Sequence, residues 1–78
     1  MGNMRKPDGL ALAGIYEIQG GRTWICTHME FCAAGLYKAG FYEPAINQYN
    51  EASREELEKM FEKEIITLKS FTRGRVII

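Results

Sequence analysis

The segment from Cys26 to Cys32 holds the residue types most able to do chemistry. Cys26, His28, Glu30 and Cys32 fall within seven residues, and thiolate, imidazole and carboxylate groups are the usual ligands of zinc. Structural zinc sites usually combine two separated ligand pairs, however, and His28 is the only histidine. Free cysteines are also common as small core residues. We therefore predict no metal and no cofactor, and keep a zinc-binding module at Cys26, His28 and Cys32 as an alternative.

The same side chains offer a nucleophile and a base. Nucleophilic catalysis also needs a group that orients the base and donors for an oxyanion, and no motif marks either role. Cys26 and Cys32 lack the Cys-x-x-Cys spacing of a catalytic dithiol. The pair Gly20-Gly21 lacks the later glycine and lysine of a phosphate-binding loop. We therefore expect that the protein is not an enzyme.

Three groups of side chains are candidates for binding another macromolecule. Glutamates at intervals of four, three and four would form one acidic stripe on a helix, namely Glu51, Glu55, Glu58 and Glu62. Aromatic residues able to stack on bases gather in an aromatic loop, namely Tyr37, Phe41, Tyr42 and Tyr49. A basic end consists of Lys69, Arg73 and Arg75. Each group also has an ordinary explanation: a solvated helix face, the bulk of the core, or cations near a helix end.

Charge argues for a protein partner. The chain has 78 residues, with 10 lysines and arginines against 10 aspartates and glutamates. A net charge of zero argues against a role dominated by phosphate contacts. The charge is uneven, however: +1 over residues 1–28, −4 over residues 29–66 and +3 over residues 67–78. Such segregation favours a partner protein that recognises an acidic or a basic end.

Hydropathy favours a cytoplasmic protein. No apolar run approaches the ~20 residues of a membrane-spanning helix, and the first ten residues are too polar for a signal peptide. We therefore expect no membrane association, and a compartment in which both cysteines stay reduced.

A hairpin is the clearest local signal. Residues 10–19 and 22–27 are rich in strand formers and flank Gly20-Gly21, which is typical of a tight turn between antiparallel strands. A two-residue loop would place Ile18 opposite Thr23. The core face would then carry Leu12, Tyr16, Ile18 and Ile25, and the other face Ile15, Trp24 and Cys26.

Two helix starts follow the hairpin. Thr27 and Glu30 match a capping box, which predicts a short helix over residues 28–39; a third strand through Phe31 is the competing interpretation. Residues 41–52 are expected to form a long loop with one helical turn after Pro44. A second capping box at residues 53–56 opens an amphipathic helix. Either this helix continues to residue 71, which we favour, or it ends near residue 63 before a strand over residues 64–70. A final strand is expected over residues 75–78.

These elements predict an α+β fold. We expect an N-terminal β-hairpin, a short helix, a longer amphipathic helix and a C-terminal strand, with the helices packed on one face of a small antiparallel sheet. Residues 1–9 would be a flexible lead-in and residues 10–78 a single small domain. A domain of this size buries only ~60% of its unfolded surface, so a homodimer would add stability.

The functional hypothesis is a small non-enzymatic interaction protein that binds another macromolecule and modulates or inhibits it, as many short proteins of phages and mobile elements do. The partner would be another protein, with a homodimer as a second expectation. The alternative is a nucleic-acid-binding module that uses the aromatic loop and the basic end.

Overall fold

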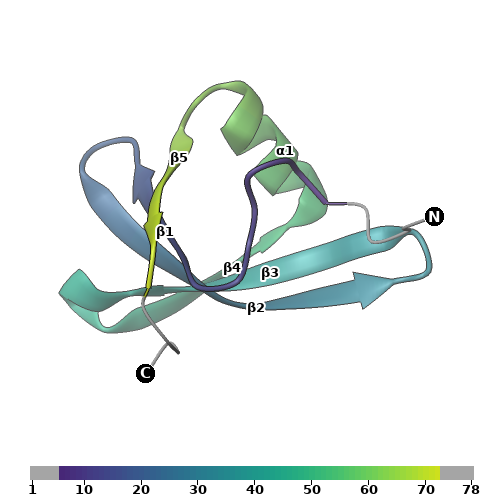
Figure 1. Ribbon diagram of the computed structural model, residues 1–78, viewed down its shortest axis with the longest axis horizontal. Coiled ribbons are helices and arrows are strands. Elements are labelled where there is room, and N and C mark those ends of the chain that lie inside the picture. The colour runs from purple at the N-terminus through teal and green to yellow at the C-terminus, as the bar shows by residue number, and fades with distance from the viewer. Residues whose placement is uncertain (1–5, 73–78) are drawn as a thin grey trace.

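A computed structural model describes residues 6–72 as a five-stranded antiparallel sheet with one α-helix (Figure 1). The strands are β1 (Gly14–Ile18), β2 (Arg22–Cys32), β3 (Gly35–Glu43), β4 (Gln48–Ser53) and β5 (Ile66–Phe71). Their order in the sheet is β4-β3-β2-β1-β5. The helix α1 (Arg54–Glu62) connects β4 to β5, so the chain crosses from one sheet edge to the other.

The expected helix-rich α+β fold is wrong. The chain is mostly antiparallel sheet with the single helix α1 in its described part, and not two helices packed on a small sheet. The segment expected as a short helix is the end of β2, a turn at Ala33-Ala34 and most of β3. Here the ladder between β2 and β3, which pairs His28 with Gly40 and Glu30 with Lys38, outweighs a local capping pattern.

The expected long loop over residues 41–52 is also wrong in most of its length. It contains the end of β3 and most of β4, joined by a short 3-10 helix η1 (Pro44–Ile46). The helical turn after Pro44 is confirmed. Asn47 ends that turn with a φ of 52°, a left-handed conformation that asparagine tolerates.

The hairpin between β1 and β2 is confirmed, but its register is not. Tyr16 lies opposite Trp24 and Ile18 opposite Arg22, so the loop has three residues, of which Gln19 is the first. The Gln19 amide donates to the Ile65 carbonyl at 2.8 Å and therefore does not donate to a residue of β2. A shift of one residue moves every side chain of a strand to the other face. Trp24 is consequently buried.

Helix α1 begins as expected. Ser53 accepts a hydrogen bond from the Glu56 amide, and the Glu56 carboxylate accepts one from the Ser53 amide. The favoured extension to residue 71 is wrong, because α1 ends at Glu62 and β5 begins at Ile66. Glu64 adopts a φ of 58°, which ends the helical path and leaves its carboxylate exposed. The β-branched residues that follow then pair with β1.

The core lies between α1 and one face of the sheet, called here the inner face. Tyr16 is fully buried at its centre, with the rings of Phe41 and Phe61 edge-on at 6.0 and 6.1 Å. The Tyr16 hydroxyl donates to the Gly9 carbonyl at 2.6 Å and accepts from the Ala11 amide at 2.8 Å. These bonds attach the segment before β1 to the core. The remaining members of the core are Leu10, Ile18, Trp24, Cys26, Leu36, Ala39, Ala52, Leu57 and Ile66.

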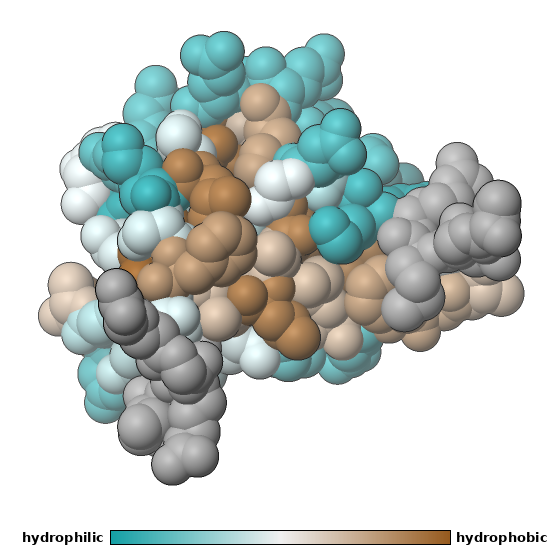
Figure 2. Space-filling view, in the orientation of Figure 1, coloured by the Kyte–Doolittle hydropathy of each residue, from teal (hydrophilic) through white to brown (hydrophobic). Residues whose placement is uncertain are grey.

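The outer face of the sheet is not covered by any described element. In Figure 1 the helix α1 lies on one side of the sheet, and the long β2–β3 hairpin extends past the helix. Figure 2 shows hydrophilic side chains in the region of α1 and hydrophobic ones gathered beneath it, towards that hairpin. The expected strand over residues 75–78 lies outside the described residues.

Candidate functional site

Two bulges decide which side chains reach the outer face. In the ladder of β2 and β3, Cys26 lies opposite Phe41 and His28 opposite Gly40, so Thr27 is an extra residue. A bulge of this kind reverses the alternation of side chains beyond it. Cys26 therefore points into the core, whereas His28 is exposed on the outer face. Tyr37 is the extra residue of a second bulge, in β3.

A continuous row of apolar side chains crosses the outer face. Ile15 lies opposite Ile25, Ile25 opposite Tyr42, and Tyr42 opposite Tyr49, so four neighbouring strands each contribute one residue. The two tyrosine rings are in contact, with centroids 5.1 Å apart. Tyr49 is 57% exposed, and the other three are half-buried. We call these four residues the outer row.

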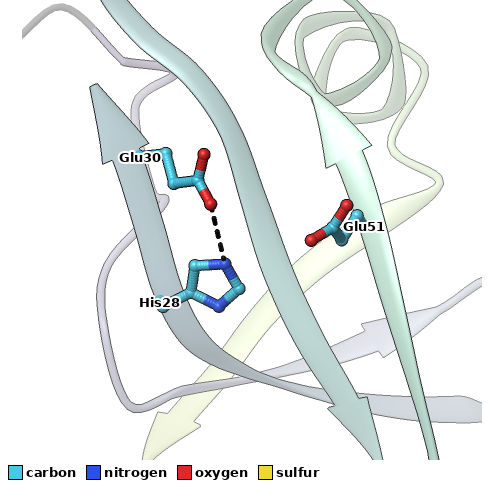
Figure 3. A group of neighbouring side chains, drawn as sticks. All are labelled: His28, Glu30 and Glu51. Carbon is cyan, nitrogen blue, oxygen red and sulfur yellow. Dashed lines mark ion pairs between the residues drawn. The ribbon is translucent and has the colours of Figure 1, made fainter. Parts of the chain in front are cut away.

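A charged cluster lies beside the outer row. It consists of His28 and Glu30 on β2, Lys38 on β3 and Glu51 on β4. His28 Nε2 lies 3.6 Å from Glu30 Oε2 (Figure 3), and Lys38 Nζ lies 3.0 Å from Glu51 Oε1. The pKa of Lys38 is raised by its hydrogen bond to Glu51 and, to a lesser degree, by the nearby charge of Glu30.

Gly40 makes room for the imidazole in this cluster. Gly40 lies between His28 and Glu51 in the ladder of three strands. A Cβ atom at residue 40 would clash with His28 Cε1, so the ring rests directly on the glycine backbone. This close approach lets the ring of His28 reach from β2 across β3 towards Glu51 (Figure 3).

The structure does not bring Cys26, His28 and Cys32 together as zinc ligands. Cys26 is buried in the core, and burial raises the pKa of its thiol to about 11. His28 lies on the opposite face of the sheet. Cys32 is exposed at the end of β2, where it lines a hollow with Tyr37 and the first residues of α1. The donor group that does assemble is His28, Glu30 and Glu51, whose ligand atoms lie within 4.8 Å of one another.

The predicted acidic stripe is divided between two faces. Glu55, Glu58 and Glu62 are exposed on α1, and Glu58 lies 3.9 Å from Arg54 Nε. Glu51 belongs to β4 and pairs with Lys38 on the outer face. The spacing that suggested one stripe includes a strand residue, which does not follow helical periodicity.

The predicted aromatic loop is divided as well. Phe41 is fully buried in the core, whereas Tyr42 and Tyr49 stand side by side in the outer row. Tyr37 is 61% exposed but lies near the start of α1, where it lines a hollow of about 250 Å³. Of the basic end, Lys69 lies on β5 with its Nζ 3.6 Å from Glu17, and residues 73 and 75 lie outside the described residues.

Glu43 is a buried carboxylate with a structural environment. Arg22 donates to both of its oxygens, at 2.7 and 3.0 Å, and Trp24 Nε1 donates at 3.1 Å. The hydrogen bonds from Arg22 are the main reason that the pKa of Glu43 is lowered. A carboxylate held ionised in this way joins β2 to β3 and is poorly suited to act as a general acid.

Sequence reasoning missed the outer row and the place of Glu51 beside His28. The alternation Lys38, Gly40, Tyr42 against Ala39, Phe41, Glu43 is a strand signal that separates outward from inward residues of β3. The contacts across strands, in contrast, depend on the register and the bulges, which no local pattern in the chain reveals.

Comparisons with protein-family models, with curated proteins and with solved structures found no match. Among residues 6–72, no helix is long and apolar enough to cross a membrane.

Proposed function

We propose that this protein is a non-enzymatic binding module that docks a basic partner protein on the outer face of its sheet, which no element among residues 6–72 covers. The observation that carries the proposal is the outer row, in which Ile15, Ile25, Tyr42 and Tyr49 form one apolar band across four strands. Binding there would cover part of the partner's surface and so modulate or inhibit it.

The composition of the outer face resembles that of a protein interface. The solvated face of an antiparallel sheet normally carries polar residues. Protein interfaces instead combine an apolar centre, rich in tyrosine, with a polar rim. The outer row supplies such a centre, and the charged cluster of His28, Glu30, Lys38 and Glu51 supplies one side of the rim.

Charge favours a basic protein over a nucleic acid. The outer face carries carboxylates at Glu17, Glu30 and Glu51, against amines at Lys38 and Lys69. Residues 6–72 as a whole have ten acidic and seven basic side chains. A nucleic acid gains most of its affinity from cations that meet its phosphates, so the pair Tyr42 and Tyr49 is poorly placed for stacking on bases.

The same charges argue against a second copy of the chain as the main occupant. A symmetric dimer on this face would add a second set of three carboxylates and two amines, whereas a basic partner would offset the excess of carboxylates. The exposed thiol of Cys32 is consistent with a cytoplasmic location, where thiols stay reduced.

Site-specific photocrosslinking tests the proposal. A photoreactive amino acid is placed at residue 49 in one variant and at residue 37 in another. Both positions hold tyrosines with similar exposure, 57% and 61%, but only residue 49 belongs to the outer row. We expect a specific partner protein to be crosslinked at residue 49 and not at residue 37. An excess of this protein without the photoreactive amino acid should compete for the partner and reduce the crosslink. Crosslinking of a protein at residue 37 alone would contradict the proposal. Crosslinking of added RNA at residue 49, with no protein crosslinked there, would contradict it as well.

A further inference from the structure

We infer that His28, Glu30 and Glu51 form a binding site for one divalent transition-metal ion of the zinc type. The three side chains come from β2 and β4, with β3 passing between them (Figure 3). Each offers one ligand atom, and the three atoms lie within 4.8 Å of one another. The inference does not depend on the partner proposed above.

The donor atoms are close to the separation that a metal ion requires. Bonds of ~2.0–2.1 Å at tetrahedral angles put ligand atoms ~3.3 Å apart. His28 Nε2 and Glu30 Oε2 are already 3.6 Å apart. All three side chains are about half exposed, at 46%, 50% and 53% for His28, Glu30 and Glu51. Side-chain rotations of these half-exposed residues would bring the three ligand atoms to that separation.

Gly40 is an independent feature that favours the site. It lies directly between His28 and Glu51 in the three-stranded ladder, and the imidazole rests on its backbone. Any larger residue would push the ring away from Glu51. The backbone positions of the three ligands are fixed by paired strands, and sites built on such elements are more precise than sites on loops.

The donor set selects the type of ion. One imidazole with two carboxylates suits zinc, whereas calcium and magnesium prefer oxygen ligands alone. Three protein ligands leave at least one coordination position open to water or to a side chain of a bound protein.

Lys38 is the competitor for this site. Its ammonium group lies 3.0 Å from Glu51 Oε1 and would have to move away before a cation binds there. Exposed ion pairs of this kind contribute little to stability, so displacement is feasible. Replacing Lys38 with methionine removes the competitor and one positive charge, and should therefore strengthen metal binding.

The test is a calorimetric titration of zinc chloride into untagged, chelator-treated protein. A Cys32→Ser background removes the exposed thiol as a rival ligand, while Cys26 is shielded by burial. We expect one zinc ion per chain. His28→Ala and Glu51→Gln should each weaken binding about tenfold or more, a loss of the size seen when metal-site residues are altered. Lys38→Met should strengthen binding, and Glu58→Gln, on the far side of the molecule, should leave it unchanged.

Two further measurements separate ligation from indirect effects. Gly40→Ala should weaken zinc binding as strongly as His28→Ala, with circular dichroism confirming that the sheet is intact. Cobalt substitution should give a visible spectrum without a thiolate charge-transfer band. Absence of zinc binding, binding unaffected by His28→Ala, or a thiolate band in the cobalt spectrum would each overturn the inference.

Discussion

Cys26 and His28 are two residues apart on β2, yet their side chains lie on opposite faces of the sheet, because Thr27 between them is a bulge. The bulge places the thiol in the core and the imidazole on the outer face. The Cys26 thiol and the His28 imidazole therefore cannot act on the same ligand or substrate. Because Cys26 is buried and Cys32 is exposed, we also expect the two thiols to differ sharply in reactivity.

Alkylation should modify Cys32 and spare Cys26 in the native protein. Cys32 is exposed, whereas Cys26 is fully buried and burial raises the pKa of its thiol to about 11, so its nucleophilic thiolate is scarce. Intact-mass spectrometry after iodoacetamide treatment should show one adduct on the native chain and two in denaturant. The variant Cys32→Ser should gain none while folded. Rapid double labelling of the native chain would contradict the buried position of Cys26.

Stability should fall in alkaline solution as the pH rises from about 9 to about 11. Burial raises the pKa of the Cys26 thiol to about 11 in the folded chain, against 9.0 for an ordinary thiol. Between these two pH values the thiol of the unfolded chain loses its proton first. Preferential ionisation of the unfolded state lowers the free energy of unfolding, by roughly 2–3 kcal/mol for a shift of this size. Urea titrations across this range measure the effect. The variant Cys26→Ala should show a shallower decline, and an identical decline would contradict the assignment.

Acidification should weaken the link between β2 and β3. The pKa of Glu43 is lowered, mainly by hydrogen bonds from Arg22, so its contribution is present above the ordinary carboxyl range and is lost as the pH falls through the lowered value. Glu43→Gln should destabilise the protein at neutral pH and reduce its sensitivity to acid. The exposed Glu58→Gln serves as the control. Equal acid sensitivity of wild type and Glu43→Gln would show that this carboxylate contributes nothing.

Removing one buried hydroxyl should detach the segment before β1. In Tyr16→Phe the Gly9 carbonyl loses a donor and the Ala11 amide loses an acceptor. We expect a loss of about 1–3 kcal/mol in the free energy of unfolding, the usual cost of leaving such groups without partners. The exposed Tyr37→Phe is the matched control and should change stability little. Hydrogen exchange at the Ala11 amide should accelerate in Tyr16→Phe only.

Several local features could be predicted from the chain alone, because each depends on neighbouring residues. The Ser53–Glu56 capping box, the turn after Pro44 and the hairpin around Gly20-Gly21 all occur where their patterns lie. Each pattern satisfies its own backbone groups within a few residues, so distant parts of the chain have little influence on it.

The remaining elements depend on pairing between strands, which reaches beyond the few residues of a local pattern. The Thr27–Glu30 pair matches a capping box but lies in a strand, because residues 28–30 find partners at residues 38–40. The hairpin register depends on Gln19, whose amide bonds to Ile65 more than forty residues away. Because the register was offset by one residue, the expected core face carried Ile25, which lies in the outer row, and excluded Trp24 and Cys26.

The most direct test of the outer row is the affinity of the crosslinked partner, once purified, for matched variants of this protein. Tyr49→Ala removes an exposed ring from the outer row, Tyr37→Ala removes one from the region near α1, and a triple glutamine variant at residues 55, 58 and 62 neutralises the exposed side of α1. We expect Tyr49→Ala to weaken binding about tenfold or more, as loss of a tyrosine that anchors an interface does. The other two variants should bind about as tightly as wild type. Binding that survives Tyr49→Ala but fails in the triple variant would move the interface to α1 and contradict the proposed function of the outer face.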